Sequence, residues 1–214
     1  MLKALVFDFD GLILDTETPE FLAWSDIYQR HGVSLDPAAW GVGVGTWDAF
    51  DPVTHLEGLT GRPVTAEELR REQRERCLAL IAAEQPLPGV RELLDGARER
   101  GLKLAVASSS GREWVEGHLR ALGLLDRFQC VRTRDDVARV KPDPELYLAA
   151  AACLGVEPGE CVAFEDSPNG ARAALAAGMR LAVIPNGITR DLAFPEGGER
   201  FASLLECRLD ELLA

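Results

Sequence analysis

The sequence predicts an α/β fold in which helices flank a parallel sheet and a small helical insertion follows the first strand. Short apolar runs alternate with amphipathic stretches along most of the 214 residues, a pattern typical of strands that alternate with helices. Glycines follow the amphipathic stretches, at positions where helices commonly end. A long segment near the N-terminus has helical patterns and no good strand, and interrupts the alternation. Together these observations favour a Rossmann-like sheet with a cap inserted into it.

The strands are predicted from short apolar runs, because strands buried on both faces of a parallel sheet are apolar throughout. The predicted strands are Ala4–Phe9, Lys103–Ala107, Arg127–Val131, Cys161–Phe164 and Leu181–Ile184. The predicted helices between them are Val90–Arg100, Arg112–Leu122, Pro144–Leu154 and Asn169–Ala177, which end at Gly101, Gly123, Gly155 and Gly178.

The inserted segment is predicted to form a helical cap. Glu20–His31 and Glu67–Glu84 read as long helices, and Gln85–Gly89 reads as the linker that returns to the sheet. An insertion at this point is expected to lie over the carboxyl ends of the strands, where ligands bind in open α/β sheets. We therefore expect a core domain of residues 1–14 and 87–214 and a cap domain of residues 15–86.

The charge of the chain argues against some classes of partner. The 35 acidic and 23 basic residues give a formal net charge of −12. Such a surface repels nucleic acids and anionic membranes, so neither is expected as a partner. A small phosphorylated metabolite remains compatible, because a bound divalent cation can reverse the field locally.

The five cysteines are expected to be reduced thiols in a cytoplasmic protein. Their number is odd, and no two are close enough in sequence to form a metal knuckle. Cys130 and Cys161 fall in predicted strands and are expected in the core; the others are Cys77, Cys153 and Cys207. Asp8 interrupts the apolar N-terminal run, unlike a signal peptide, and no run approaches the roughly 20 apolar residues of a membrane span.

Two carboxylates stand at the end of the first predicted strand, in Phe7-Asp8-Phe9-Asp10-Gly11. Asp8 could attack phosphorus without a base, because a carboxylate is already ionised at neutral pH. Asp10 could protonate the leaving oxygen and later accept a proton from water. Solvated acids at a strand end are the alternative, and this motif alone does not decide between the two interpretations.

A second acidic pair, Glu165 and Asp166, ends the strand predicted at Cys161–Phe164. Taken alone, Asp166 or Ser167 would be interpreted as a helix cap. Two acidic strand ends at one edge of a sheet, however, repel each other unless a cation joins them. Oxygen ligands select a hard ion, so the sequence predicts a Mg²⁺ site.

Two further elements could bind a phosphate. Ser108 to Gly111 follow the strand Lys103–Ala107, and hydroxyl and backbone N–H groups before a helix suit phosphate oxygens. A helix-capping role is the alternative, and it is favoured for Ser110 more than for Ser108. Lys141, which precedes a proline, could supply a fixed positive charge, although most lysines are merely solvated.

In their order along the chain, these four elements resemble the motifs of the haloacid dehalogenase-like superfamily, within its β-phosphoglucomutase-like and phosphatase branch. The chain has the start D-x-D-G-x-x-x-D-[ST]-E, a strand-end serine, K-P-x-P and E-D-S-x-x-G, and the resemblance spans nearly its whole length. It implies a phosphatase with an α/β core, a helical cap and bound Mg²⁺.

The resemblance also implies a role for each matching residue. Asp8 is expected to be the nucleophile that forms an aspartyl-phosphate, and Asp10 the general acid and base. Ser108 and Lys141 are expected to hold the phosphate during catalysis, supported by Ser109. The expected Mg²⁺ ligands are Asp8, the backbone carbonyl of Asp10, Asp166 and, directly or through water, Glu165.

Two departures from the family pattern favour hydrolysis over sugar phosphomutase activity. The phosphomutase of this branch has a cap histidine where this chain has Glu20, and a cap arginine in the segment matching Gly41–Thr46, which contains none. The predicted function is hydrolysis of a small phosphorylated metabolite by a monomer or weak homodimer. The alternatives are a sugar phosphomutase and a non-catalytic phosphometabolite or cation sensor, although the intact set of catalytic residues argues against the sensor.

Cap residues are the hardest to interpret. Gly41–Gly45 could suggest a nucleotide loop, but it lacks a preceding strand and a Lys-Ser/Thr pair, so a flexible cap loop is favoured. Tryptophans of the cap are expected to pack there, and Trp24 or Trp47 could line a specificity pocket. The candidate substrate contacts in or near the cap are Thr16, Glu20 and Trp47.

Overall fold

A six-stranded parallel sheet, in the order β3-β2-β1-β4-β5-β6, forms the centre of the computed structural model, which describes residues 1–46 and 49–212. The strands are β1 (Ala4–Phe7), β2 (Lys103–Ala107), β3 (Cys130–Arg132), β4 (Cys161–Glu165), β5 (Arg180–Val183) and β6 (Gly198–Arg200). The predicted α/β fold with a parallel sheet is confirmed.

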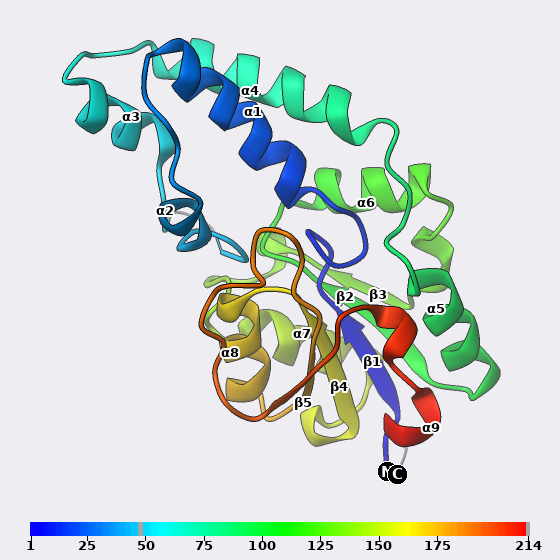
Figure 1. Ribbon diagram of the computed structural model, residues 1–214. Coiled ribbons are helices and arrows are strands. Elements are labelled where there is room, and N and C mark those ends of the chain that lie inside the picture. The colour runs from blue at the N-terminus through cyan, green and yellow to red at the C-terminus, as the bar shows by residue number, and fades with distance from the viewer. Residues whose placement is uncertain (47–48, 213–214) are drawn as a thin grey trace.

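Helices cover both faces of this sheet and form a separate group beyond its carboxyl end (Figure 1). The α-helices are α1 (Glu17–Arg30), α2 (Pro37–Gly41), α3 (Pro52–Thr60), α4 (Ala66–Ile81), α5 (Val90–Glu99), α6 (Arg112–Ala121), α7 (Glu145–Leu154), α8 (Pro168–Ala176) and α9 (Leu209–Leu212). Short 3₁₀ helices lie at Leu125–Arg127, Arg134–Asp136, Pro158–Glu160 and Leu204–Glu206.

Each predicted strand and helix of the alternating part is present, with its ends shifted by a few residues. The four glycines predicted to end helices all have positive φ, the conformation that suits this position. Strand β6 and helices α2, α3 and α9 were not predicted, and the first long helix begins at Glu17 instead of Glu20.

Alternate residues of β1 face opposite sides of the sheet and enter different cores. Leu5 and Phe7 pack with residues of α5, α6 and α9, whereas Ala4 and Val6 pack with residues of α7 and α8. All four side chains are fully buried. The central strand is therefore held on both faces, which gives the residues that follow it a rigid support.

Helices α1 to α4 form the group predicted as the cap. Helix α1 packs along α4, and a separate apolar cluster that includes Trp24, Tyr28 and Trp40 joins the group. Figure 1 shows these helices beyond the end of the sheet at which α1 begins. This arrangement supports the proposed division into a core and a cap, whose boundaries, at residues 15 and 86, remain predictions.

A disulfide between Cys130 and Cys153 corrects the expectation that all cysteines are reduced. The two sulfur atoms are 2.15 Å apart and the Cα atoms 6.3 Å apart. The cysteines meet because α7 packs against β3, a contact that their separation of 23 residues did not reveal. Cys77, Cys161 and Cys207 are free and buried, as expected for Cys161. Reduced thiols therefore no longer support the predicted cytoplasmic location, which remains a prediction.

Within the described ranges, no helix has both the length and the apolar composition that a membrane span requires.

Candidate active site

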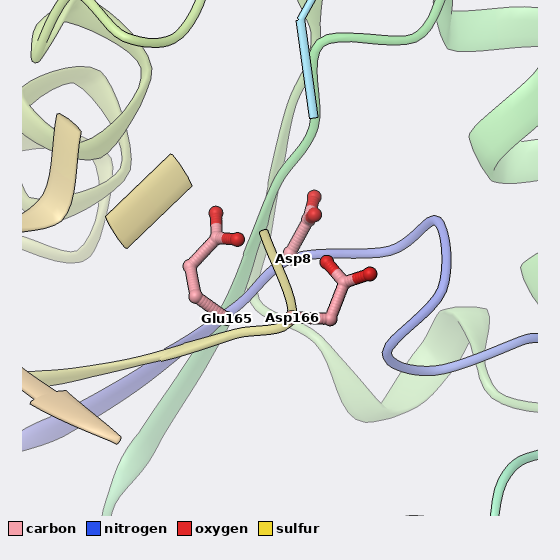
Figure 2. Close-up of side chains that lie close together, drawn as sticks. All are labelled: Asp8, Glu165 and Asp166. Atoms are coloured by element: carbon pink, nitrogen blue, oxygen red, sulfur yellow. The ribbon is translucent and has the colours of Figure 1, made fainter. Parts of the chain in front are cut away.

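The first and fourth strands place three carboxyl groups together. Asp8 follows β1, and Glu165 ends β4 and is followed by Asp166. These strands are neighbours, with Phe7 opposite Phe164, so their carboxyl ends meet at one edge of the sheet. One oxygen from each carboxyl group lies within 4.8 Å of the others, and Figure 2 shows the three groups side by side. The structure thus brings together the acids that the sequence assigned to a metal site.

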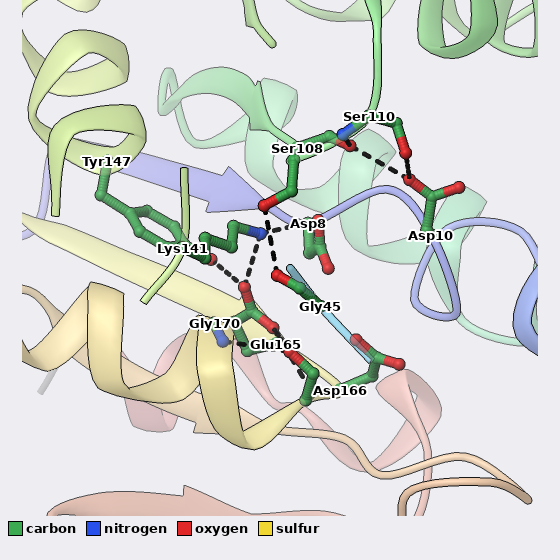
Figure 3. A network of polar contacts seen from close by, with 12 residues as sticks. Asp8, Asp10, Gly45, Ser108, Ser110, Lys141, Tyr147, Glu165, Asp166 and Gly170 are labelled. Carbon is green, nitrogen blue, oxygen red and sulfur yellow. Dashed lines mark hydrogen bonds and ion pairs between the residues drawn. The ribbon is translucent and has the colours of Figure 1, made fainter. Parts of the chain in front are cut away.

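Lys141 joins two of these acids. Figure 3 shows it between Asp8 and Glu165. Its Nζ lies 2.7 Å from Asp8 Oδ1 and 2.7 Å from Glu165 Oε1, and its side chain is fully buried. Burial alone would lower the pKa of Lys141, but the charges of Asp8 and Glu165 outweigh burial and raise it above its ordinary value. Lys141 is therefore a fixed positive charge beside Asp8.

Other side chains hold Glu165 in place. The Tyr147 hydroxyl donates to Glu165 Oε1, and the Ser167 hydroxyl donates to Glu165 Oε2 at 3.2 Å. Ser167 also caps α8, as the alternative interpretation had it, by accepting from the Gly170 amide. A Cβ at Gly170 would lie 1.8 Å from Glu165 Oε1, which explains the glycine of this motif. Both oxygens of Glu165 thus bind protein donors, and its role as a metal ligand remains a prediction.

Asp166 has one bonded and one unbonded oxygen. Its Oδ2 accepts from Asn186 Nδ2 at 2.6 Å, whereas its Oδ1 is buried and has no hydrogen-bond partner among the residues described. Gly11 has a positive φ of 75°, and a Cβ there would lie 2.3 Å from Asp166 Oδ2, so the turn after β1 must be glycine. A buried, unpaired carboxylate oxygen beside Asp8 fits a hard divalent cation such as Mg²⁺.

Electrostatics at the site also fit a cation. Burial, followed by the charge of Glu165, raises the pKa of Asp8 to about 7, although Lys141 opposes the rise. Burial, followed by the charges of Asp8 and Glu165, raises the pKa of Asp166 well above its ordinary value. Without a cation, these carboxyl groups therefore resist full ionisation.

The carboxyl group of Asp10 accepts four hydrogen bonds. Its Oδ1 accepts from Thr16 Oγ1 at 3.0 Å and Trp114 Nε1 at 2.8 Å. Its Oδ2 accepts from Ser108 Oγ at 3.1 Å and Ser110 Oγ at 2.7 Å (Figure 3). The hydroxyl of Ser110 therefore binds Asp10 and does not cap a helix. The N-cap of α6, the role favoured for Ser110 from the sequence, is Gly111.

A segment of the predicted cap, residues 42–46, lies directly against the core. Ser109 Oγ donates to the Gly45 carbonyl at 3.1 Å, and Thr46 Oγ1 donates to the Lys141 carbonyl. Asn169 Nδ2 donates to the Val44 carbonyl at 2.9 Å. The glycine-rich segment thus closes one side of the site.

A cavity of about 700 Å³ opens beside Asp8. Core residues that line it include Asp8, Asp10, Ser109 and Ser110, and residues from the predicted cap include Glu17, Glu20, Trp24, Trp40 and Gln73. The predicted contact Glu20 therefore faces this space. Ser108 and Thr16 are buried and bind Asp10, and Trp47 lies outside the described residues.

Several residues of the site were not predicted from the sequence. Asn186 follows β5, so the rule that found Asp8 and Asp166, a polar residue after a strand, could have found it as well. Glu17 is the last residue of the motif D-x-D-G-x-x-x-D-[ST]-E, but no role was predicted for it. Trp114, Tyr147 and Asn169 stand on helices, and no spacing in the sequence distinguishes them.

Residues 2–178 match the family model described as haloacid dehalogenase-like hydrolase. The chain belongs to this hydrolase family. Among curated proteins it is 47% identical over 213 residues to Putative phosphatase YhcW of Bacillus subtilis (strain 168), covering 100% of this chain and 97% of the relative. It is 31% identical to Beta-phosphoglucomutase of the same strain, covering 83% of this chain and 81% of the relative.

A solved structure of the family has the same fold. CbbY from Rhodobacter sphaeroides, in complex with phosphate, superposes with a TM-score of 0.77 at 29% identity, and the match covers 96% of each chain. The fold and family inferred from the four motifs are therefore confirmed, and the roles of individual residues remain proposals.

Proposed function

We propose that this hydrolase is a Mg²⁺-dependent phosphomonoesterase that acts on a small phosphorylated metabolite through an aspartyl-phosphate on Asp8. The observation that supports it best is the position of Asp8 after the central strand, where its Oδ1 lies 2.7 Å from Lys141 Nζ and its carboxyl group clusters with that of Asp166, whose buried Oδ1 has no partner among the described residues. This arrangement offers a nucleophile and positive charge on one side and a cation site on the other.

In the proposed reaction, a carboxylate oxygen of Asp8 attacks phosphorus and the ester P–O bond breaks. Asp10 gives a proton to the departing alcohol. Water then attacks the aspartyl-phosphate with Asp10 as base, which releases inorganic phosphate and restores Asp8. The contacts with Thr16, Ser108, Ser110 and Trp114 orient Asp10. When Asp10 carries the proton that it gives to the alcohol, one of the hydroxyls on that oxygen rotates to accept instead of donate.

Charge neutralisation is divided between the chain and the cation. Lys141 offsets the negative charge that accumulates as two anions approach each other. Asp8, Asp166 and the Asp10 backbone carbonyl would hold Mg²⁺, with Glu165 as a further ligand, and the ion would neutralise phosphoryl oxygens. Before α6, the Ser109 and Gly111 amides would bind the phosphate, since the Ser110 amide already donates to Ser108 Oγ at 3.0 Å and the Arg112 amide to Asp135 Oδ2 at 2.8 Å.

Hydrolysis of p-nitrophenyl phosphate tests the proposal. We expect turnover with Mg²⁺, loss of turnover with EDTA, and a decrease in kcat of on the order of 10⁴-fold or more in Asp8→Asn. Acid-quenched enzyme should carry one phosphoryl group on the peptide that contains Asp8. The melting temperature of the variant controls for misfolding. Absence of turnover with every phosphomonoester in the presence of Mg²⁺ would contradict the proposal.

The similarity to Beta-phosphoglucomutase keeps a sugar phosphomutase as the second candidate. Hydrolysis is favoured because Glu20, instead of a histidine, faces the cavity. Incubation with a sugar phosphate separates the candidates: free phosphate indicates hydrolysis, and an isomer formed without free phosphate indicates the mutase.

A further inference from the structure

Two buried side chains donate to one oxygen of Glu165. The Lys141 ammonium lies 2.7 Å from Glu165 Oε1, and the Tyr147 hydroxyl donates to the same oxygen. Figure 3 shows both contacts as dashed lines. Each of the three residues is at most 1% exposed. Glu165 therefore divides its charge between the ammonium that also contacts Asp8 and a hydroxyl that has no part in the proposed reaction.

The carboxyl group of Glu165 is held from other sides as well. Its Oε2 accepts from the Ser167 hydroxyl at 3.2 Å and from the Ser167 amide at 3.4 Å. The backbone of Gly170 lies so close that a Cβ there would be 1.8 Å from Oε1. The carboxylate is thus confined, whereas the flexible stem of Lys141 allows its ammonium to shift between acceptors.

Tyr147 contacts the ammonium as well as its acceptor. Lys141 Nζ lies 5.1 Å from the centroid of the Tyr147 ring, within the range of a cation–π interaction. An ammonium has three protons, and Asp8 and Glu165 are its acceptors among the described residues. These contacts orient Lys141 and leave one proton for a phosphoryl oxygen.

Loss of the Tyr147 hydroxyl would change how strongly Glu165 attracts Lys141. A hydroxyl donor offsets part of the negative charge on Oε1. Without it, Lys141 is the donor that remains on this oxygen in the described structure, and the two opposite charges attract each other more strongly. The ammonium is then drawn towards Glu165 and away from Asp8, where the proposed reaction needs it.

The other tyrosine of the chain shows a hydroxyl that only satisfies its own burial. Tyr28 is also fully buried, but its hydroxyl donates to the Pro52 carbonyl at 2.7 Å and lies 3.0 Å from His55 Nδ1. A buried hydroxyl needs one acceptor, and a backbone carbonyl is sufficient. The hydroxyl of Tyr147 instead contacts a carboxylate that already pairs with Lys141.

We propose that Tyr147 is a positioning residue for phosphoryl transfer, whose hydroxyl and ring keep the Lys141 ammonium against Asp8. This inference rests on the proposed phosphatase function. It predicts that the Tyr147 hydroxyl contributes to the rate through Lys141 and not through the stability of α7.

Tyr147→Phe removes the hydroxyl and retains the ring. With p-nitrophenyl phosphate and saturating Mg²⁺, we expect kcat to fall by at least about fivefold and KM to change by less than about twofold, because Lys141 acts mainly on charge that develops in the transition state. Tyr28→Phe is the matched control, since it also removes a bonded, buried hydroxyl, and its kcat should stay within about twofold of the wild type. Equal decreases in the two variants would overturn the inference.

A double-mutant cycle with Lys141→Met tests whether Tyr147 acts through Lys141. In the Lys141→Met background, Tyr147→Phe should lower kcat by less than about twofold, because the ammonium that it positions is absent. A merely structural hydroxyl would lower kcat by the same factor in both backgrounds, which would overturn the inference. Melting temperatures of all four proteins control for misfolding, and the Tyr147→Phe measurements are decisive even if Lys141→Met does not fold.

Binding of Mg²⁺ distinguishes an effect on Lys141 from an effect on the proposed metal ligands. Calorimetry without substrate should give Tyr147→Phe a Kd for Mg²⁺ within about twofold of the wild type, and a larger rise would show that Tyr147 acts on the metal site and that the inference is wrong. If the wild type hydrolyses p-nitrophenyl phosphate and Tyr147→Phe has the same kcat, the inference is wrong and the phosphatase function stands. If no phosphomonoester is hydrolysed, both are wrong.

Discussion

Asp10 connects parts of the chain that are distant in the sequence. Its carboxyl group accepts from Thr16, six residues away, and from Ser110 and Trp114, which are 100 and 104 residues away. The residue proposed as general acid and base is therefore oriented by α6 and by the start of the predicted cap together. Each donor can be removed singly, which makes the orientation testable.

Trp114→Phe removes one donor and retains an aromatic ring. Because the Trp114 Nε1 bond to Asp10 Oδ1 is 2.8 Å long, we expect its loss to lower kcat by about tenfold, equivalent to about 1.4 kcal/mol of activation free energy. The melting temperature should change little, since phenylalanine can still pack against His118. The measurement is kcat with p-nitrophenyl phosphate beside a melting curve. A kcat equal to that of the wild type would show that this donor does not orient Asp10.

Asn186 is expected to orient Asp166, the proposed metal ligand. Its Nδ2 donates to Asp166 Oδ2 at 2.6 Å, and its Oδ1 accepts from the Ile188 amide at 2.8 Å, so both ends of the amide are held. Residues that orient metal ligands commonly contribute about 10–100-fold to affinity. Asn186→Ala should therefore raise the Kd for Mg²⁺ by about this factor, measured by calorimetry without substrate.

Asn169→Ala is the matched control for Asn186→Ala. It also removes a buried amide, but one that binds the Val44 carbonyl instead of a proposed metal ligand. Its Kd for Mg²⁺ should stay close to that of the wild type. If both variants bind Mg²⁺ equally well, Asn186 has only a structural role in its turn.

Acids at strand ends were predictable, and their supporting residues were not. Asp8 and Asp166 follow apolar runs, so topology alone brings them to one edge of the sheet. Tyr147 lies on the buried face of α7, where an aromatic residue usually contributes only to packing. Its hydroxyl reaches Glu165 because of the way in which α7 packs against the sheet. Contacts of this kind depend on tertiary packing, which hydrophobic periodicity does not encode.

At the scale of elements, the missed segments share a weak hydrophobic signal. Strand β6 is exposed along its whole length at the edge of the sheet, so it lacks the apolar run of the other strands. Helix α2 has five residues and α9 has four, each too short to show a clear helical period. Helices α2 and α3 begin after an aspartate cap followed by proline, Asp36-Pro37 and Asp51-Pro52, a signal of helix starts that could have revealed them.

The disulfide between β3 and α7 is expected to stabilise the fold. It closes a loop between residues 23 positions apart, which corresponds to about 3 kcal/mol of unfolding free energy in the chain-entropy account. Cys153 is exposed, so Cys153→Ser changes little besides the cross-link. We expect this variant to melt at a lower temperature than the oxidised wild type.

Reductant supplies the control for Cys153→Ser. Dithiothreitol should lower the melting temperature of the wild type towards that of the variant and leave the variant itself unchanged. A wild type that melts at the same temperature as the variant, with and without reductant, would show that the pair contributes nothing to stability.

At the scale of the whole molecule, the site concentrates negative charge in a chain that is already acidic. The formal net charge is −12, and Asp8, Glu165 and Asp166 are buried together. Lys141 forms ion pairs with Asp8 and Glu165. A ligand that neutralises the negative charge at this edge of the sheet is therefore expected to stabilise the folded state. The free energy of unfolding should thus depend on both pH and Mg²⁺.

In EDTA, stability should fall as pH rises from about 4 to about 7. The pKa of Asp8 is about 7 in the folded protein and 3.8 ordinarily, so between these values the folded state retains a proton that the unfolded chain releases. Removal of protons by rising pH therefore favours the unfolded chain, until the folded carboxyl group also ionises. The raised pKa of Asp166 acts in the same direction.

Saturating Mg²⁺ should reverse this trend, because the cation favours the ionised carboxylates. At about 100 times its Kd, a ligand that binds only the folded state adds about 2.7 kcal/mol, so the melting temperature near pH 8 should be clearly higher with Mg²⁺ than with EDTA. Asp166→Asn removes one of the crowded charges and one proposed ligand. This variant should lose less stability between about pH 4 and pH 7 in EDTA, and Mg²⁺ should raise its melting temperature less. Identical melting temperatures of the wild type with Mg²⁺ and with EDTA near pH 8 would mean that these acids do not form a cation site.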